Sequence, residues 1–150
     1  LKLHSYAQTI FLDYDIHIVE ECVGKELAST SYSWKSLMDM GLTVSNGTDC
    51  PVEMPNALAG MQCAITRTDR KGSVEPYLLE QAFSVKEALD SYTTQSAYAS
   101  FDEKVKGKIQ KDYLADFVIL DKNPFTVEVS TIQDIQVLET YVAGKCVYQK

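Results

Sequence analysis

Residues 34–49 read WKSLMDMGLTVSNGTD and contain one complete helix–strand unit. Apolar side chains at helical spacing in residues 34–40 predict a short helix, and Gly41 is a natural terminator for it. The run 42–45 then predicts a short buried strand, which the turn-forming pair Asn46-Gly47 ends. A helix, a glycine, a short buried strand and a polar loop make one unit of an α/β repeat, so we expect an α/β fold here.

Similar patterns extend the α/β organisation on both sides of this unit. Aromatic and branched residues in 3–12 predict a strand, and apolar residues at roughly helical spacing predict a helix over 15–27. Farther along, residues 57–65 form another amphipathic helical pattern. Ser84 and Glu87 have the spacing of a capping box, which predicts a helix directly after Ser84.

The pattern changes near residue 106, where β-type sequences replace the helical ones. A dense apolar strand is expected over 114–120. Residues 135–142 alternate, and a glycine-containing turn connects them to 146–148, which predicts a hairpin. We therefore expect two parts, an α/β part in residues 1–105 and an all-β tail in residues 106–150.

The composition limits the classes of partner. The 150-residue chain carries 21 acidic and 14 basic residues, a formal charge of −7. Lysines in residues 104–111 are interleaved with acidic residues and form no basic stripe, which argues against nucleic acid or an anionic membrane as partner. No apolar run approaches the roughly 18 residues of a membrane helix. A small-molecule or protein partner is expected instead.

The cysteines indicate a reducing compartment. Cys22, Cys50, Cys63 and Cys146 form no C-x-x-C pair and match no zinc-finger spacing. Four cysteines in a chain of this length do not make a disulfide scaffold, so we expect free thiols and a cytoplasmic protein.

Asp49 is the strongest candidate for a chemical role, because it comes directly after the strand expected at 42–45. A carboxylate at the C-terminal end of a barrel strand points toward the mouth where catalytic groups collect. There it can bind a metal and accept a proton from water. The simpler interpretation, an Asx turn or a helix N-cap ahead of Pro51, remains open and is favoured by spacing alone.

The other candidate residues have simpler structural interpretations. His4 and His17 lie in different expected elements and form no metal-binding motif, and two histidines do not complete a zinc site. Cys50 has no base near it in sequence and is more simply a loop thiol. Arg67 and Arg70 are candidates to bind an anionic substrate group from a loop, with exposed arginines at a helix end as the favoured alternative.

Five stretches, taken in order, resemble one branch of the amidohydrolase superfamily, the YtcJ-like or type 3 branch. They correspond to its G-S-D-x-P-V segment and the helix after it, its L-T-V-E-E-A-L…Y-T helix, its G-x-I-x-x-G-x-x-A-D-L-V-V-L-D run and its V-x-G-x-x-V-Y hairpin. In this chain they are residues 45–53, 61–67, 83–93, 107–121 and 142–148. The sequence departs from the pattern at Thr48, where serine is usual, and at Lys111, where the run has its second glycine.

This resemblance implies a fragment of a larger fold, the last strands and helices of a TIM-like (β/α)8 barrel plus part of a small β-sandwich. Residues 1–12 would hold strand seven and 41–49 strand eight, and the tail from 106 would belong to the sandwich. Asp49 would inherit the role of the last-strand aspartate, as metal ligand and as the base that takes the proton of the hydrolytic water. The family's other ligands have no counterpart in this chain.

The resemblance further implies a parent hydrolase that uses one or two divalent metals, most often zinc, to attack amide, N-formyl or related C–N bonds. The segment alone is expected to be inactive, because it retains one ligand where a catalytic zinc site uses three. The main alternative is a non-catalytic, amidohydrolase-like regulatory or binding module. An isomerase or deaminase on the same scaffold is a weaker alternative. We also expect the isolated segment to self-associate, which would cover its apolar faces and strand edges.

Overall fold

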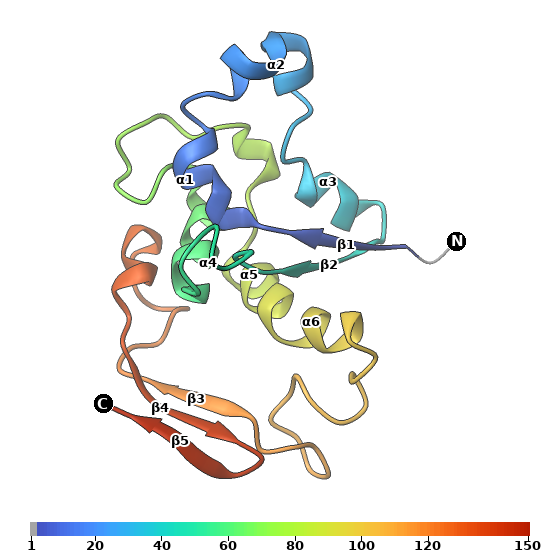
Figure 1. Ribbon diagram of the computed structural model, residues 1–150, viewed down its shortest axis with the longest axis vertical. Coiled ribbons are helices and arrows are strands. Elements are labelled where there is room, and N and C mark those ends of the chain that lie inside the picture. The colour runs from blue at the N-terminus through green and yellow to red at the C-terminus, as the bar shows by residue number, and fades with distance from the viewer. Residues whose placement is uncertain (1–2) are drawn as a thin grey trace.

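Two short parallel strands lie at the centre of the α/β part. The computed structural model describes residues 3–150, with β1 at His4–Ala7 and β2 at Thr43–Asn46 (Figure 1). The two strands pair in parallel, from His4 opposite Thr43 to Ala7 opposite Asn46. β1 is shorter than the strand expected over 3–12, because the chain turns after Ala7 into a 3-10 helix, η1, at Thr9–Phe11.

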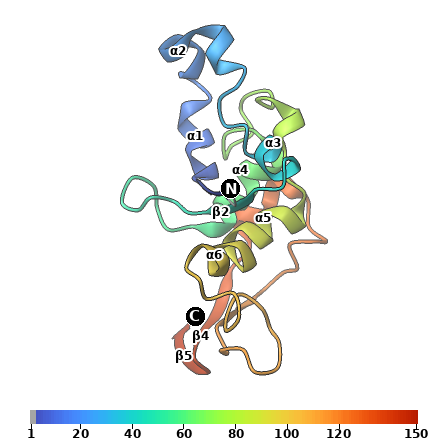
Figure 2. The ribbon, with the colours of Figure 1, turned by 90° about the vertical axis from the view of Figure 1, so that its right-hand side faces the viewer.

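The connection from β1 to β2 is helical, as parallel pairing requires. It contains α1 (Leu12–Asp15), α2 (Val19–Ala28) and α3 (Trp34–Asp39), and Figure 2 shows α2 at the far end of the molecule from the β tail. α2 is kinked at Gly24, whose φ of 78° and ψ of 157° are not helical. The helix predicted over 34–40 is confirmed, and Gly41 ends it with a positive φ of 86°.

The helices after β2 pack beside the strand pair. They are α4 (Ala57–Thr66), the 3-10 helix η2 (Leu79–Gln81), α5 (Val85–Tyr92) and α6 (Thr94–Ala99). The capping box predicted at Ser84 is confirmed, since the Ser84 hydroxyl accepts from the Glu87 amide and the Glu87 carboxylate accepts from the Ser84 amide.

The tail forms a three-stranded antiparallel sheet in the order β3-β4-β5. Its strands are β3 (Phe117–Leu120), β4 (Val137–Val142) and β5 (Lys145–Gln149), and the 3-10 helix η3 (Val129–Asp134) precedes β4. The predicted hairpin is confirmed. Ala143 and Gly144 make its two-residue turn with φ of 49° and 77°, the positive values that a tight hairpin needs.

The two sheets share one hydrophobic core. Ile132 of η3 is 0% exposed and Ile135 is 3% exposed, and both belong to the buried cluster formed by the α/β part. A polar contact reinforces this junction. The backbone N–H of Gln133 donates to the side-chain oxygen Oε1 of the buried Gln62 in α4 at 3.1 Å. The division expected after residue 105 thus separates two sheets but not two cores. The other buried members of the cluster are Ala7, Val44, Met61, Ala64, Phe83 and Ala88.

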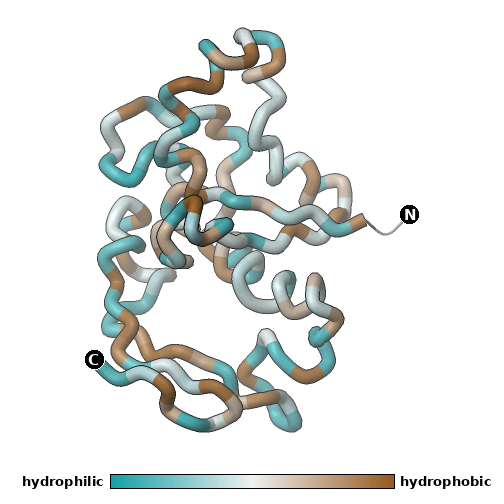
Figure 3. The backbone as a smooth tube through the Cα atoms, viewed as in Figure 1, coloured by the Kyte–Doolittle hydropathy of each residue, from teal (hydrophilic) through white to brown (hydrophobic). Residues whose placement is uncertain are grey.

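The three-stranded sheet leaves much apolar surface uncovered. Figure 3 shows hydrophobic stretches along the strands of the tail, and β3 and β5 are the edge strands of their sheet. Val118, Val142 and Val147 are about half exposed (50%, 51% and 56%). Among residues 3–150, no helix combines the length and apolar character needed to cross a lipid bilayer.

Gly60 of α4 makes room for the Tyr92 hydroxyl of α5. A β-carbon at residue 60 would lie 2.0 Å from Tyr92 Oη and 3.1 Å from its Cζ. We expect Gly60→Ala to lower the free energy of unfolding by about 1–3 kcal/mol, the usual cost of overpacking. In a Tyr92→Phe background the loss should shrink, because the oxygen is gone and alanine favours a helix by roughly 0.5–1 kcal/mol. Urea unfolding of the four proteins checks this, and an equal loss in both backgrounds would contradict it.

Candidate active-site region

Asp49 lies on an exposed turn beyond the end of β2. The strand ends at Asn46, and Asp49 follows three residues later with a φ of 52°. Its carbonyl oxygen accepts from the Val52 amide at 2.8 Å, and its side chain is exposed. Asp49 does not cap the next helix, because Asn56 does so by accepting from the Ala59 amide at 3.1 Å. The turn therefore presents a carboxylate to the space beyond the strand ends.

The two histidines lie elsewhere and have partners of their own. The His4 ring contacts the hydroxyls of Thr43 and Ser45 at 2.6 and 2.8 Å, which ties the start of β1 to β2. Burial lowers the pKa of His4, which favours the neutral ring in this contact. His17 Nε2 lies 3.4 Å from the buried Asp69 carboxylate. Their contacts thus match the structural interpretation favoured by the sequence.

The donor atoms of the described residues meet only part of what a divalent metal needs. The exposed Asp49 carboxylate suits a divalent cation as one oxygen ligand. Within the described part of the chain, however, no three or more His, Cys, Asp or Glu side chains gather in a group that could hold a metal ion. A protein zinc site uses at least three such ligands. Asp49 therefore fits a metal only as one contributor, and the remaining ligands would have to come from outside residues 3–150.

Arg67 occupies a different environment from the open loop expected for it. The side chain is 0% exposed, at the left-handed C-cap of α4. Its guanidinium donates to the carbonyl oxygens of Tyr77 at 2.9 Å and Tyr32 at 3.2 Å, and it lies 5.8 Å from the centre of the Trp34 ring. Burial lowers its pKa to about 10. The expected exposure is therefore wrong, because the guanidinium is buried against these backbone carbonyls, and the substrate-binding role of Arg67 stays a prediction.

All four thiols are free, and one of them is buried. Cys22, Cys50 and Cys146 are exposed, whereas Cys63 lies inside α4. Burial raises the pKa of Cys63 to about 12, so its thiol stays protonated at pH 8, and only thiolates react quickly. We expect a disulfide reagent at pH 8 to label three thiols in the folded protein and a fourth after denaturation. Rapid labelling of all four without denaturant would contradict the burial of Cys63.

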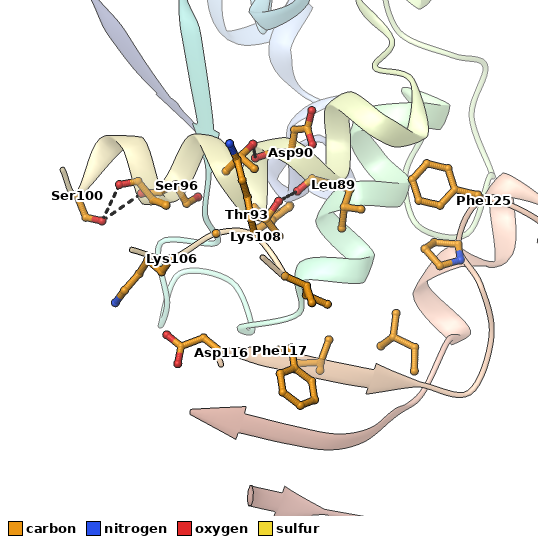
Figure 4. A pocket seen from close by; sticks show the side chains of 18 of the residues that line it. Leu89, Asp90, Thr93, Ser96, Ser100, Lys106, Lys108, Asp116, Phe117 and Phe125 are labelled. Atoms are coloured by element: carbon orange, nitrogen blue, oxygen red, sulfur yellow. Dashed lines mark hydrogen bonds between the residues drawn. The ribbon is translucent and has the colours of Figure 1, made fainter. Parts of the chain in front are cut away.

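An apolar cleft, which no sequence pattern indicated, lies between the helices α5 and α6 and the strand β3. It encloses about 850 Å³, and Figure 4 shows Leu89 and Thr93 on the helical side facing Phe117 of the sheet, with Phe125 at one end. Lys106 and Asp116 lie toward the other end. Asp49 is not among the lining residues. This cleft is thus separate from the candidate carboxylate.

The chain is similar to known proteins along nearly its whole length. Residues 3–148 match the model described as the amidohydrolase family. The chain belongs to the amidohydrolase family. The predicted resemblance is confirmed. This chain supplies only part of an amidohydrolase fold, because it spans about a quarter of the length of the relatives reported below.

Three relatives define this partial coverage. The chain is 32% identical over 144 residues to YtcJ of Bacillus subtilis (strain 168), covering 95% of the chain and 27% of YtcJ. It is 31% identical over 117 residues to the N-substituted formamide deformylase of Arthrobacter pascens, covering 77% of the chain and 21% of the deformylase. The crystal structure of an uncharacterized metal-dependent hydrolase from Pyrococcus horikoshii OT3 superposes with a TM-score of 0.74 at 32% identity. The match covers 85% of this chain and 26% of the hydrolase.

Several buried polar residues that shape this amidohydrolase segment were missed by sequence reasoning. Thr9 and Ser91 are 0% exposed and Gln62 is 2% exposed, yet each looks like an ordinary polar residue in the sequence. Their partners lie far away along the chain, such as Gly60 for Thr9 and Gln133 for Gln62. Only Asn46 carried a local signal, as an asparagine before a glycine at a strand end, and it indicated a turn rather than a contact.

Proposed function

We propose that the chain is the C-terminal part of a longer metal-dependent hydrolase that acts on amide or other C–N bonds. N-acyl and N-formyl compounds are the proposed substrate class, supported by the similarity to the formamide deformylase. The observation that carries the proposal is the exposed Asp49 carboxylate on the turn after β2, inside a segment that matches the amidohydrolase family over residues 3–148.

In this proposal β1 and β2 are the seventh and eighth strands of a (β/α)8 barrel, and β3 to β5 belong to a small β-sandwich. The parallel pairing of β1 with β2, and the helices beside them, support the barrel assignment. The antiparallel tail supports the sandwich assignment. The proposed parts are residues 1–105 and 106–150, joined through the shared core around Ile132.

Asp49 has two tasks in the proposed site. A divalent metal, zinc in this proposal, supplies Lewis acidity when it is bound. Asp49 offers one carboxylate oxygen as a ligand, and the carboxylate also accepts the proton that a hydrolytic water gives up. Because the segment offers one ligand where three are needed, we propose that it is inactive alone.

Metal content tests this function most directly. We would measure zinc and other divalent metals by plasma mass spectrometry in the full-length protein and in the 150-residue segment, then screen N-formyl and N-acyl compounds for hydrolysis. Stoichiometric metal in the full-length protein, none in the segment, and hydrolysis that a chelator abolishes are expected. A full-length protein that takes up no metal after reconstitution would exclude the proposal.

The second candidate is a non-catalytic regulatory or binding module with an amidohydrolase fold. Residues 3–150, as described, gather no group of three metal-binding side chains, which is compatible with this module and equally with a hydrolase segment whose other ligands lie elsewhere. The two candidates differ in the rest of the protein. An H-x-H pair and further histidines upstream would favour the hydrolase, and their replacement by other residues would favour the module.

We also propose that the isolated segment self-associates. The supporting features are the half-exposed valines of the tail and its edge strands β3 and β5, which offer unpaired backbone groups to another chain. Light scattering of the segment should therefore give a mass above that of one 16.8 kDa chain. A monodisperse monomer across the concentration range would contradict this.

A further inference from the structure

The Asn46 side chain joins the end of β2 to two other elements. Its Oδ1 accepts from the Thr9 amide at 3.1 Å, and its Nδ2 donates to Thr9 Oγ1 at 2.8 Å and to Ser91 Oγ at 3.4 Å. Thr9 begins η1, after β1, and Ser91 belongs to α5. Both groups of the amide are thus engaged by residues more than thirty positions away in the sequence.

These partners are themselves fixed. Thr9 is 0% exposed, and its hydroxyl donates to the Gly60 carbonyl oxygen of α4 at 2.7 Å. Ser91 is also 0% exposed, and its hydroxyl donates to the Ala88 carbonyl oxygen at 2.7 Å. A buried hydrogen-bonded network of this kind has few alternative arrangements, because any unpaired member would be costly. The amide of Asn46 therefore has one well-defined position.

The turn that carries Asp49 leaves the sheet from this anchor. The Gly47 amide donates to the Ala7 carbonyl oxygen at 3.0 Å, which extends the attachment to β1 by one residue. Only Gly47 and Thr48 separate Asn46 from Asp49. Three residues span at most about 10 Å, so the anchor limits where the Asp49 carboxylate can lie. Metal ligands tolerate displacements of only about 0.5 Å.

We propose that Asn46 is a positioning residue for Asp49. Its amide sets the point and direction at which residues 47–49 leave the strand pair, and through them the place of the carboxylate. The inference rests on the proposed function, in which Asp49 is a metal ligand. Asn46 itself contacts neither metal nor substrate in this proposal.

The test compares zinc affinity, measured by chelator competition, in full-length Asn46→Ala, Asn46→Asp and Ser84→Ala proteins. Asn46→Asp is close to the same shape but loses the two donated hydrogen bonds. Ser84→Ala is the matched control, because it weakens the cap of α5 without touching the anchor. We expect both Asn46 variants to bind zinc about 10–100-fold more weakly, as for residues that orient a metal ligand, with the control unchanged.

The outcomes separate the two proposals. Asn46 variants that bind zinc as tightly as the control would overturn the positioning role, while loss of zinc in Asp49→Ala would leave the proposed function standing. Zinc retained by Asp49→Ala would overturn both. If the variants do not fold, the rate of amide hydrogen exchange at Gly47 in the wild-type protein tests whether the residue after Asn46 is held against β1. Slow exchange is expected, and exchange at the rate of an unstructured chain would overturn the anchor.

Discussion

If the proposed function holds, the full-length Asp49→Ala protein should lose its bound metal and its hydrolytic activity together. Removing a direct ligand leaves the metal one oxygen short. The loss of metal affinity should therefore exceed the roughly 10²-fold loss caused by replacing residues that only orient ligands. Metal content by mass spectrometry and the rate of N-formyl hydrolysis are the two measurements. Because Asp49 is exposed on a turn, the thermal midpoint of the metal-free protein should fall only by the small amount that alanine costs at a positive φ.

Asp112→Ala is the matched control for this substitution. Asp112 is also an exposed aspartate with a positive φ, 69° against 52° for Asp49, so both replacements impose a similar backbone strain. The control should keep both metal and activity. If the two variants behaved alike, a general effect of replacing turn aspartates would explain the result, and Asp49 would have no special role.

Ile132→Ala should destabilise the whole 150-residue chain by about 2–5 kcal/mol, the usual cost of removing a buried isoleucine side chain to the β-carbon. Ile132 is 0% exposed and reaches from η3 into the core of the α/β part. Trp34, the one tryptophan, packs against that core from α3. Its fluorescence during urea unfolding therefore reports on the α/β part while the substitution lies in the tail.

Ile119→Ala makes the comparison specific. Ile119 is also in the tail, in β3, but is 41% exposed, so its loss should cost well under half as much. If Ile132→Ala left the Trp34 transition unchanged, the tail would unfold independently of the α/β part. The shared core would then not join the two sheets in solution.

Local sequence signals predicted local structure well. The glycine after α3, the capping box of α5 and the hairpin before β5 each depend on residues within about four positions, and each is present as expected. The parallel pairing of β1 with β2 came from the family resemblance rather than from periodicity. Asp49 was placed correctly after a strand, although three residues beyond its end.

Structure that depends on distant partners could not be predicted. The helix predicted after Ser84 ends at Tyr92, because Thr93, with a φ of −122° and a ψ of −89°, separates α5 from α6 without a glycine or proline to signal the break. Arg67 is buried by carbonyl oxygens ten and thirty-five positions away. Asn46 engages Ser91 of α5, which no local pattern reveals. For Arg67 and Asn46 the partner, not the residue itself, determines the position.

The shared core around Ile132 bears on where the chain can be cut. Residues 108–112 are all exposed, so a protease could cleave the backbone there without reaching the interior. The two pieces would stay together, because Ile132 and Ile135 of the second piece are buried among side chains of the first and Gln133 is hydrogen-bonded to Gln62. A nicked molecule would come apart only on denaturation, which makes this loop a natural site for dividing the protein into two complementing halves.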